Sequence, residues 1–282
     1  MSVAYGCKLK LKDVCIIRYG KDHKRLEDGV IPVYGSGGVI RHVNSWIWDK
    51  PSVLIPRKGT LGNLYYANGP FWTVDTLFWT IVDSTKVLPK YLYYLLKTKN
   101  LAALDVGTAV PSLTVDTLNE VEIDLPPLGV QRQVVELLDS IEKMIEGNAR
   151  LNGYLEELAD GMFRRHFRGL TDNATLADFA NVTMGQSPAG SSYNEAGIGT
   201  IFYQGRAEFG WRYPTQRLST TEPKRMAKAG DVLMSVRAPV GDLNLAYEDC
   251  CIGRGLAAIH CDYPSYGLYP VSYTHLTLPT IA

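Results

Sequence analysis

The sequence predicts an α+β protein in which two β-rich domains are separated by a long helix of the coiled-coil type. Three observations lead to this fold class: a heptad stripe between Pro126 and Gly169, short β-branched and aromatic runs on both sides of it, and a repeat that relates the two sides. We expect a first domain at residues 1–125, a spacer helix at 126–170 and a second domain at 171–269.

The first segment has the composition of a small β-rich domain. Runs such as VCIIRYG, IPVYGSGGVI and LFWTIV are separated by glycine, proline and asparagine, a pattern that is typical of short strands and turns. Apolar residues then recur at helical spacing from Leu88 to Leu101, which predicts a helix. After it, the alternating apolar residues of VPSLTVDTLNEVEIDLPP predict a strand that returns the chain to the spacer helix.

The spacer helix has clear start and stop signals. Pro126 and Pro127 suit the turn before a helix, and Gly169 suits the position after one. Between them, seam residues alternate in steps of four and three, and a single Asn on such a seam commonly fixes register. A stripe of this kind needs a partner, although an ordinary core helix of a globular domain is the alternative. The expected helix interface consists of Leu137, Ile141, Met144, Asn148, Leu151, Leu155, Leu158 and Met162.

The segment after the helix repeats the plan of the first segment. LKDVCIIRYGK, from Leu11, aligns with LADFANVTMGQ, from Leu176, at an offset of 165. The block beginning at Ser52 aligns without a gap with the block beginning at Asp231, at an offset of 179, so the second copy carries 14 additional residues between the two blocks. Chance similarity of two β-rich segments is the alternative, but the long ungapped block favours two copies of one domain.

Composition limits the possible classes of function. The 282 residues, 46% of them hydrophobic, are enough for two folded domains. No apolar run reaches membrane-spanning length and the N-terminus does not read as a signal peptide, so we expect a cytoplasmic protein. The five cysteines form no CxxC pair and fit reduced thiols. The net charge is zero, but residues 1–128 hold 15 Lys and Arg against 12 Asp and Glu, so this segment is the better candidate for a polyanionic partner.

Several features together resemble the specificity subunits of type I restriction-modification enzymes. They are the paired β-rich domains, the IDLPPLGVQ entry to the helix, the GQSP turn at Gly185 and the GDVLMSVRAPVGDLNLAYE stretch from Gly230. Each motif is weak alone, but their order and spacing over roughly residues 8–269 are specific. The resemblance implies sequence-specific binding of double-stranded DNA, with each domain reading one half of a bipartite target. It also implies that the helix spaces the domains and docks methyltransferase and motor-nuclease subunits, with a second copy of the chain as a further possible partner.

The sequence differs from the family pattern at its C-terminal end, and several other assignments remain open. The family pattern has a second long helix after the second domain, and the sequence shows no counterpart. The second copy also has no match for the helix and strand that follow Ile81 in the first copy, so we expect the second domain to be incomplete. The tail at 270–282 reads as non-native, with a natural terminal strand as the alternative. The chain could instead be a half-subunit-like scaffold that pairs with a second chain, the recognition fragment of a single-chain methyltransferase-nuclease, or an unrelated carbohydrate-active repeat protein.

The sequence predicts recognition without catalysis. It has no G-x-x-x-x-G-K-[ST] loop for a motor, and the glycines from Gly35 read as a turn between strands. The histidines lack metal-site spacing, so we expect no catalytic residue, no metal and no cofactor. Base readout instead needs forked or planar donors and acceptors on rigid loops. The expected DNA-binding residues are Lys21, His23, Lys24, Arg25, Arg41, His42, Asn44, Lys58, Gln186, Gln204, Arg206, Arg212, Gln216, Arg217 and Arg237. Of these, Lys58 and Arg237 lie inside the repeated block and suit phosphate contacts or a structural role.

Overall fold

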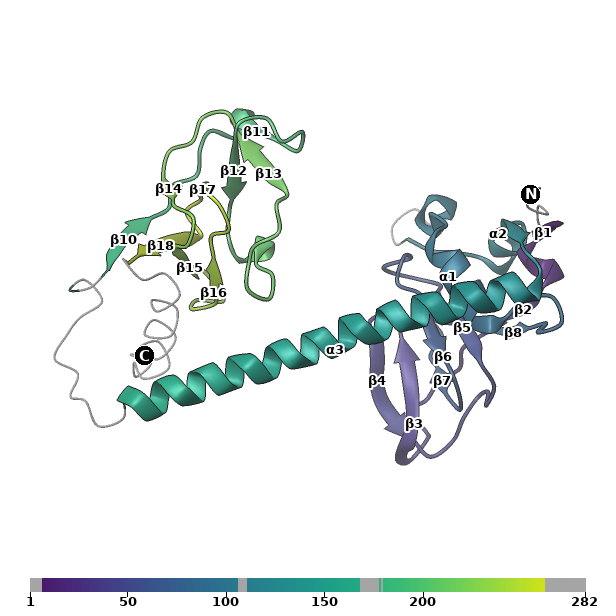
Figure 1. The fold of residues 1–282 in the computed structure, drawn as a ribbon. Coiled ribbons are helices and arrows are strands. Elements are labelled where there is room, and N and C mark those ends of the chain that lie inside the picture. Colours follow the sequence, from purple (N-terminus) through teal and green to yellow (C-terminus); the bar gives the residue numbers. More distant parts are fainter. Residues whose placement is uncertain (1–6, 106–110, 168–177, 179, 262–282) are drawn as a thin grey trace. The chain divides into compact units, whose positions relative to one another are not determined.

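The computed structural model describes residues 7–105, 111–167, 178 and 180–261 of the chain (Figure 1). The chain folds as two compact units, Met1–Arg150 and Leu151–Ala282. Both units are β-rich, and the long helix α3 (Leu128–Phe167) lies between their sheets in the sequence, so the predicted α+β class is confirmed. The tail at 270–282 lies outside the described residues, and the predicted domain limits remain predictions.

The described residues of the first unit form three antiparallel or mixed sheets. Its four-stranded sheet has the order β2-β8-β5-β6, its three-stranded sheet has the order β4-β3-β7, and β1 pairs with β9. The strands are β1 (Cys7–Lys10), β2 (Cys15–Tyr19), β3 (Asp28–Gly35), β4 (Gly38–Val43), β5 (Ser52–Pro56), β6 (Tyr65–Ala67), β7 (Trp72–Thr73), β8 (Leu77–Val82) and β9 (Glu122–Leu125).

The core of the first unit forms on both faces of β5, all of whose residues are buried. Val53 and Ile55 face one cluster and Leu54 faces the other, as the period of two in a strand requires. Helix α1 (Pro89–Lys97) covers the first face and buries Leu92 and Leu96 there. Proline suits its first turn, because the missing N–H would have no partner inside the helix.

The stretch that was expected to form one strand before α3 divides into a helix and a strand. Residues Val115–Asn119 form the short helix α2, and only Glu122–Leu125 form β9. The Thr114 hydroxyl accepts a hydrogen bond from the Thr117 N–H at 3.2 Å, which caps the first turn of α2. This local cap outweighs the alternating apolar pattern, so the strand prediction was wrong over the first part of the stretch.

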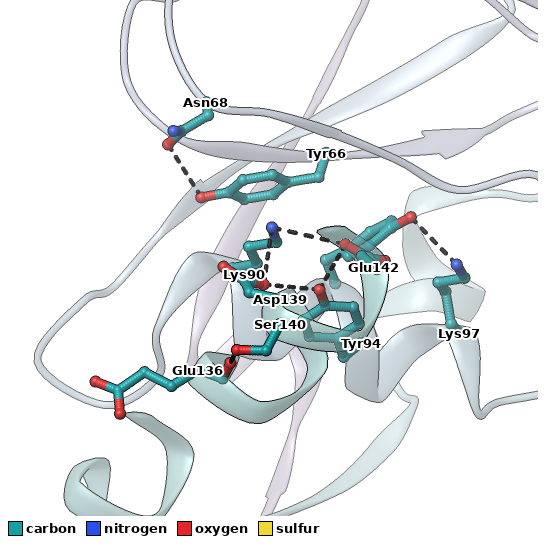
Figure 2. Close-up of polar contacts among 10 residues, drawn as sticks. Tyr66, Asn68, Lys90, Tyr94, Lys97, Glu136, Asp139, Ser140 and Glu142 are labelled. Carbon is teal, nitrogen blue, oxygen red and sulfur yellow. Dashed lines mark hydrogen bonds and ion pairs between the residues drawn. The ribbon is translucent and has the colours of Figure 1, made fainter. Parts of the chain in front are cut away.

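Helix α3 lies within the predicted range 126–170, and its first turns dock on the first unit. Gln131 is fully buried there, and Asp139 and Glu142 contact α1 (Figure 2). The seam is on other faces of the helix and is exposed in the single chain, for example 62% at Leu137 and 66% at Met144. The docking residues and the heptad seam are therefore two separate surfaces of α3.

The second unit contains two sheets. A four-stranded sheet has the order β10-β18-β15-β16, and a five-stranded sheet has the order β11-β13-β12-β17-β14. The strands are β10 (Asn181–Met184), β11 (Tyr193–Asn194), β12 (Thr200–Tyr203), β13 (Leu218–Thr220), β14 (Met226–Ala227), β15 (Val232–Ser235), β16 (Leu243–Leu245), β17 (Cys250–Ile252) and β18 (Leu256–His260).

The two four-stranded sheets repeat one topology with the same register. Leu54 on β5 lies opposite Trp79 and Tyr65. At the offset of 179, Leu233 on β15 lies opposite Ala258 and Asn244. Ladder geometry is thus retained although the paired side chains differ, which is what two copies of one domain predict.

The second copy also repeats the parallel strand pair and the hairpin of the first copy. The hairpin of the second copy has the longer loop. Strand β3 is parallel to β7 and antiparallel to β4, just as β12 is parallel to β17 and antiparallel to β13. Val33 pairs with Arg41, 8 positions further on. Phe202 pairs with Leu218, which is 16 positions further on. Eight of the 14 additional residues therefore lie in the β12–β13 hairpin.

Candidate nucleic-acid interface

Both repeats place a polar residue at the same point after the first strand of the four-stranded sheet. The Lys21 N–H donates to the Thr73 carbonyl at 2.8 Å, and the Gln186 N–H donates to the Ile252 carbonyl at 3.0 Å. Both side chains are exposed. Because these backbone contacts match, Lys21 and Gln186 occupy equivalent positions at the end of their sheets.

A glycine precedes each of these two residues, and the packing requires it. A Cβ on Gly20 would lie 2.0 Å from the Val74 carbonyl oxygen, and a Cβ on Gly185 would lie 2.2 Å from the Gly253 carbonyl oxygen. No larger residue fits without moving the backbone. The glycines therefore allow each chain segment to pass directly over the turn that precedes β8 or β18.

A second pair of equivalent residues flanks the other side of this turn. The Arg57 N–H donates to Thr76 at 2.8 Å, and the Val236 N–H donates to Gly255 at 2.9 Å. These contacts fix the strand ends that carry Lys58 and Arg237, both of which are exposed. The alignment of Lys58 with Arg237 thus corresponds to a shared position in the two folds.

The second repeat adds two more polar residues at this end of the sheet. The Gly253 N–H donates to the carbonyl of Tyr203 at 2.8 Å, which brings Gln204 beside the turn. Arg254 lies in the turn itself, is exposed, and donates its N–H to the Ser187 hydroxyl at 3.2 Å. Arg254 was not among the predicted DNA-binding residues, although the offset of 179 places it in the turn between two repeated strands.

The loop after β2 presents several cations of the first repeat. Lys21, Lys24 and Arg25 are exposed, and His23 is partly buried. Asp22 accepts a hydrogen bond from the Lys24 N–H at 3.1 Å, and this bond lowers the pKa of the Asp22 carboxyl. The loop therefore has a defined turn geometry, with its lysine and arginine side chains directed to solvent.

Two residues that were predicted to bind DNA have contacts that hold this loop in place. Arg41 donates to the Asp28 carboxylate at 2.6 Å and to the Leu26 carbonyl at 3.1 Å. Asn44 donates to Glu27 at 3.0 Å. Arg41 and Asn44 therefore position the chain between β2 and β3, whereas His42, which lies between them in the sequence, is exposed.

The β12–β13 hairpin loop, residues 204–217, contains the remaining predicted residues. Arg217 pairs with Glu208 at 2.8 Å, and Arg206 pairs with Asp242. The Arg212 guanidinium lies 5.9 Å from the centre of the Trp211 ring. Gln204 and Gln216 are exposed. The loop thus combines one internal ion pair, one ion pair to Asp242 outside the loop, and amide and aromatic groups at the surface.

This arrangement suits contacts to nucleic acid. Exposed cations on fixed strand ends can contact phosphates, and exposed amides and forked cations on loops can contact base edges. Within the described ranges, there is no group of three or more His, Cys, Asp or Glu residues that could hold a metal ion. A helix with the length and apolar character of a membrane crossing is likewise not found among the residues that the structure describes.

Two copies of one β-rich unit, with polar side chains on equivalent strand ends and a long helix between them in sequence, define a duplicated β-rich protein. Residues 8–157 match the family model described as the type I restriction modification DNA specificity domain. The chain belongs to this family.

Individual relatives agree with the family assignment. The chain is 35% identical over 202 residues to the putative type I restriction enzyme MjaX specificity subunit of Methanocaldococcus jannaschii, which covers 63% of this chain and 48% of that protein. It is 27% identical over 145 residues to the putative type I specificity subunit S.MpnORF285P of Mycoplasma pneumoniae, covering 48% and 47%. The chain thus spans about half the length of the curated relatives that it matches.

A solved structure has the same fold. The crystal structure of the type I restriction-modification system S subunit from M. genitalium aligns with a TM-score of 0.61 at 16% identity, covering 98% of this chain and 78% of that one. At this identity the match supports the fold alone.

Proposed function

We propose that this chain is the DNA-recognition subunit of a type I restriction-modification system and that each repeat reads one half of a bipartite double-stranded target. The observation that carries the proposal is the pairing of equivalent polar positions, Lys21 with Gln186 and Lys58 with Arg237, at the ends of sheets with the same register. Two copies of one reader on a single chain suit a target that consists of two half-sites.

The two kinds of position suit two kinds of contact. Lys58 and Arg237 extend from fixed strand ends and would neutralise phosphates, which gives affinity without sequence preference. The 21–25 loop and the 204–217 loop carry forked and planar groups that would read base edges in the major groove. Gln186 and Gln204 lie between the strand ends and the loops, and they suit base contacts because an amide can bind adenine with two hydrogen bonds.

Under this proposal the chain recognises DNA and other subunits perform the chemistry. Methyltransferase subunits and motor-nuclease subunits of the same system would dock on helix α3, which would also space the two recognition domains. The exposed apolar seam supports this role, because solvent-exposed rows of large apolar residues mark interaction sites. The cytoplasm, where such a system meets DNA, is the proposed location.

A second candidate is a half-subunit-like scaffold that pairs with another chain through α3. The observation that favours it is the same seam, which is 53% exposed at Leu151 and at Leu155 and 65% exposed at Met162. A recognition fragment of a single-chain methyltransferase-nuclease is a third candidate, which the sequence adjoining this chain in its gene would test.

The proposed function is tested by salt-dependent binding of the full chain to a pool of random duplex DNA. Each phosphate contact lowers log K by about 0.9 per unit of log salt concentration. Lys58→Ala and Arg237→Ala should therefore each reduce the salt slope by about one unit, whereas Lys143→Ala, on α3, should leave it unchanged. Binding that does not depend on salt, or equal slopes for all four proteins, would contradict DNA recognition by these strand ends.

A further inference from the structure

A buried amide holds the middle of the 204–217 loop. Asn244 lies on β16 and is only 2% exposed. Its Oδ1 accepts a hydrogen bond from the Gly210 N–H at 3.1 Å, and its Nδ2 donates to the Gly210 carbonyl at 3.0 Å. One side chain thus binds both backbone groups of a residue 34 positions away. Such a paired contact fixes the backbone of Gly210 relative to the sheet.

A buried carboxylate joins the two ends of the same loop. Glu208 is 4% exposed, and its Oε2 accepts a hydrogen bond from the Gly205 N–H at 3.0 Å. Its Oε1 accepts from Arg217 at 2.8 Å, and its carbonyl accepts from the Thr215 N–H at 2.7 Å. A buried charge is tolerated only when it is paired and hydrogen-bonded. Glu208 therefore requires that the start and end of the loop stay together.

The first repeat uses the equivalent sheet position for the same purpose. Tyr65 on β6 lies opposite Leu54 on β5, and Asn244 on β16 lies opposite Leu233 on β15. The Tyr65 hydroxyl donates to the Ser36 carbonyl at 2.9 Å, in the turn that joins β3 to β4. In the first repeat the long Tyr65 side chain thus reaches the short turn between β3 and β4. In the second repeat the shorter Asn244 side chain binds the longer 204–217 loop.

We propose that Asn244 and Glu208 are positioning residues that fix the 204–217 loop for reading one half-site. The proposal rests on the proposed DNA recognition by this chain. Side chains such as Trp211, 57% exposed, and Gln216 extend from a loop whose backbone is tied to the sheet. Readout by hydrogen bonds requires donors and acceptors held within a few tenths of an ångström of their position, so loss of the ties should broaden recognition at that half-site.

The test uses the full chain and a library of duplex DNA with randomised sequence. The variants are Asn244→Ala, which removes both bonds to Gly210, and Glu208→Gln, which keeps the side-chain shape but removes the charge opposite Arg217. Asn181→Ala is the matched control, because Asn181 is exposed on β10 of the same unit. Bound sequences are compared position by position, and backbone amide exchange in residues 205–217 is measured without DNA.

We expect both variants to lower base discrimination about tenfold at positions of one half-site and to leave the other half-site unchanged. Amide exchange in the loop should rise about tenfold in Asn244→Ala, and the control should match the wild type in both measurements. If the wild type selects no sequence, the proposed function fails. If the wild type selects a sequence and Asn244→Ala selects it as stringently, exchanges its loop amides at the wild-type rate, or loses both half-sites equally, the positioning role is wrong.

Discussion

The Gln131 side chain accepts a hydrogen bond from the Leu88 N–H at 2.9 Å and so joins the start of α3 to the start of α1. Its Nε2 donates to the Lys86 and Pro126 carbonyls at 3.0 and 2.8 Å. Gln131 is fully buried, and it is the last residue of the IDLPPLGVQ segment that carried part of the family resemblance. The function of this segment in the fold is therefore structural, because it anchors the long helix to the first unit.

Replacement of Gln131 should weaken this anchor. Gln131→Ala leaves three backbone groups without a partner, and we expect a loss of about 1–3 kcal/mol in the free energy of unfolding. Gln133→Ala is the matched control, because Gln133 is exposed on the same helix. Urea unfolding of the full chain measures the difference. Equal midpoints for the two variants would show that Gln131 does not hold α3 in place.

A second contact of α3 should make its docking sensitive to acid. Asp139 binds Lys90 at 2.8 Å and accepts a hydrogen bond from Tyr94 at 2.8 Å (Figure 2). Burial acts to raise the pKa of Asp139, but the hydrogen bonds and charge of Lys90 and the bond from Tyr94 outweigh it, so the pKa is lower than its ordinary value of 3.8. The stabilisation is therefore present above pH 3.8 and is lost as the pH falls through the folded-state value.

Asp139→Asn should reveal this dependence. We expect the free energy of unfolding of the variant to be roughly 1 kcal/mol lower than that of the wild type at pH 7. This difference should shrink once the pH falls below 3.8. Asp160→Asn, in the exposed pair with Arg164 on the same helix, is the control and should change little at either pH. Urea midpoints at pH 7, 5 and 3.5 give the comparison. A difference that persists unchanged at pH 3.5 would argue against the ion pair as its cause.

The exposed seam of α3 should drive association of the chain. A row of large apolar residues that includes Ile141, Met144 and Leu158 is 43–66% exposed, and helices with such seams pair with one another. We expect the full chain to form dimers or larger species at micromolar concentration, and Leu151→Asp to reduce this association. Arg150→Asp adds the same side chain next to the seam and is the control. A wild-type monomer in light scattering, with its helix content intact, would count against a coiled-coil role.

Substitutions in the first repeat should separate into three classes. Replacement of a base-reading residue of the 21–25 loop should cost about 1–3 kcal/mol of binding free energy and relax the preference at one target position. Replacement of a phosphate-contacting residue should weaken binding to all sequences alike. Arg41→Ala and Asn44→Ala should act indirectly, because these residues hold Asp28 and Glu27. Competition binding with altered half-sites distinguishes the classes. Unchanged affinity and preference in Ala variants at Lys21, His23, Lys24, Arg25, Arg41, His42 and Asn44 would exclude readout by this region.

The duplication could be predicted because two blocks of the sequence align at defined offsets, and the long helix could be predicted because its apolar residues recur at heptad spacing. The offset of 179 corresponds to ladder pairs, so Leu54 and Leu233 occupy the same place in their sheets. The prolines before α3 mark its start within two residues of the observed Leu128. These signals are either local in the chain or repeated along it, so they can be recognised in a single sequence.

The contacts that join distant segments could not be predicted in this way. DNA binding by Arg217 remains a prediction, but no local pattern indicated its ion pair with the buried Glu208. Tyr65 and Asn244 hold equivalent hairpins with unlike side chains, so an alignment of similar residues does not detect their shared role. The docking residue Asp139 lies outside the heptad seam, and its role depends on where α1 lies.

The proposed function requires that the two repeats read two half-sites of one DNA target. Selection of duplexes bound by the full chain from a randomised library tests it most directly. We expect two specified segments separated by an unspecified gap of constant length, with Lys21→Ala and Gln186→Ala each altering recognition of a different segment. A single contiguous motif, or bound duplexes with no preferred sequence, would contradict it.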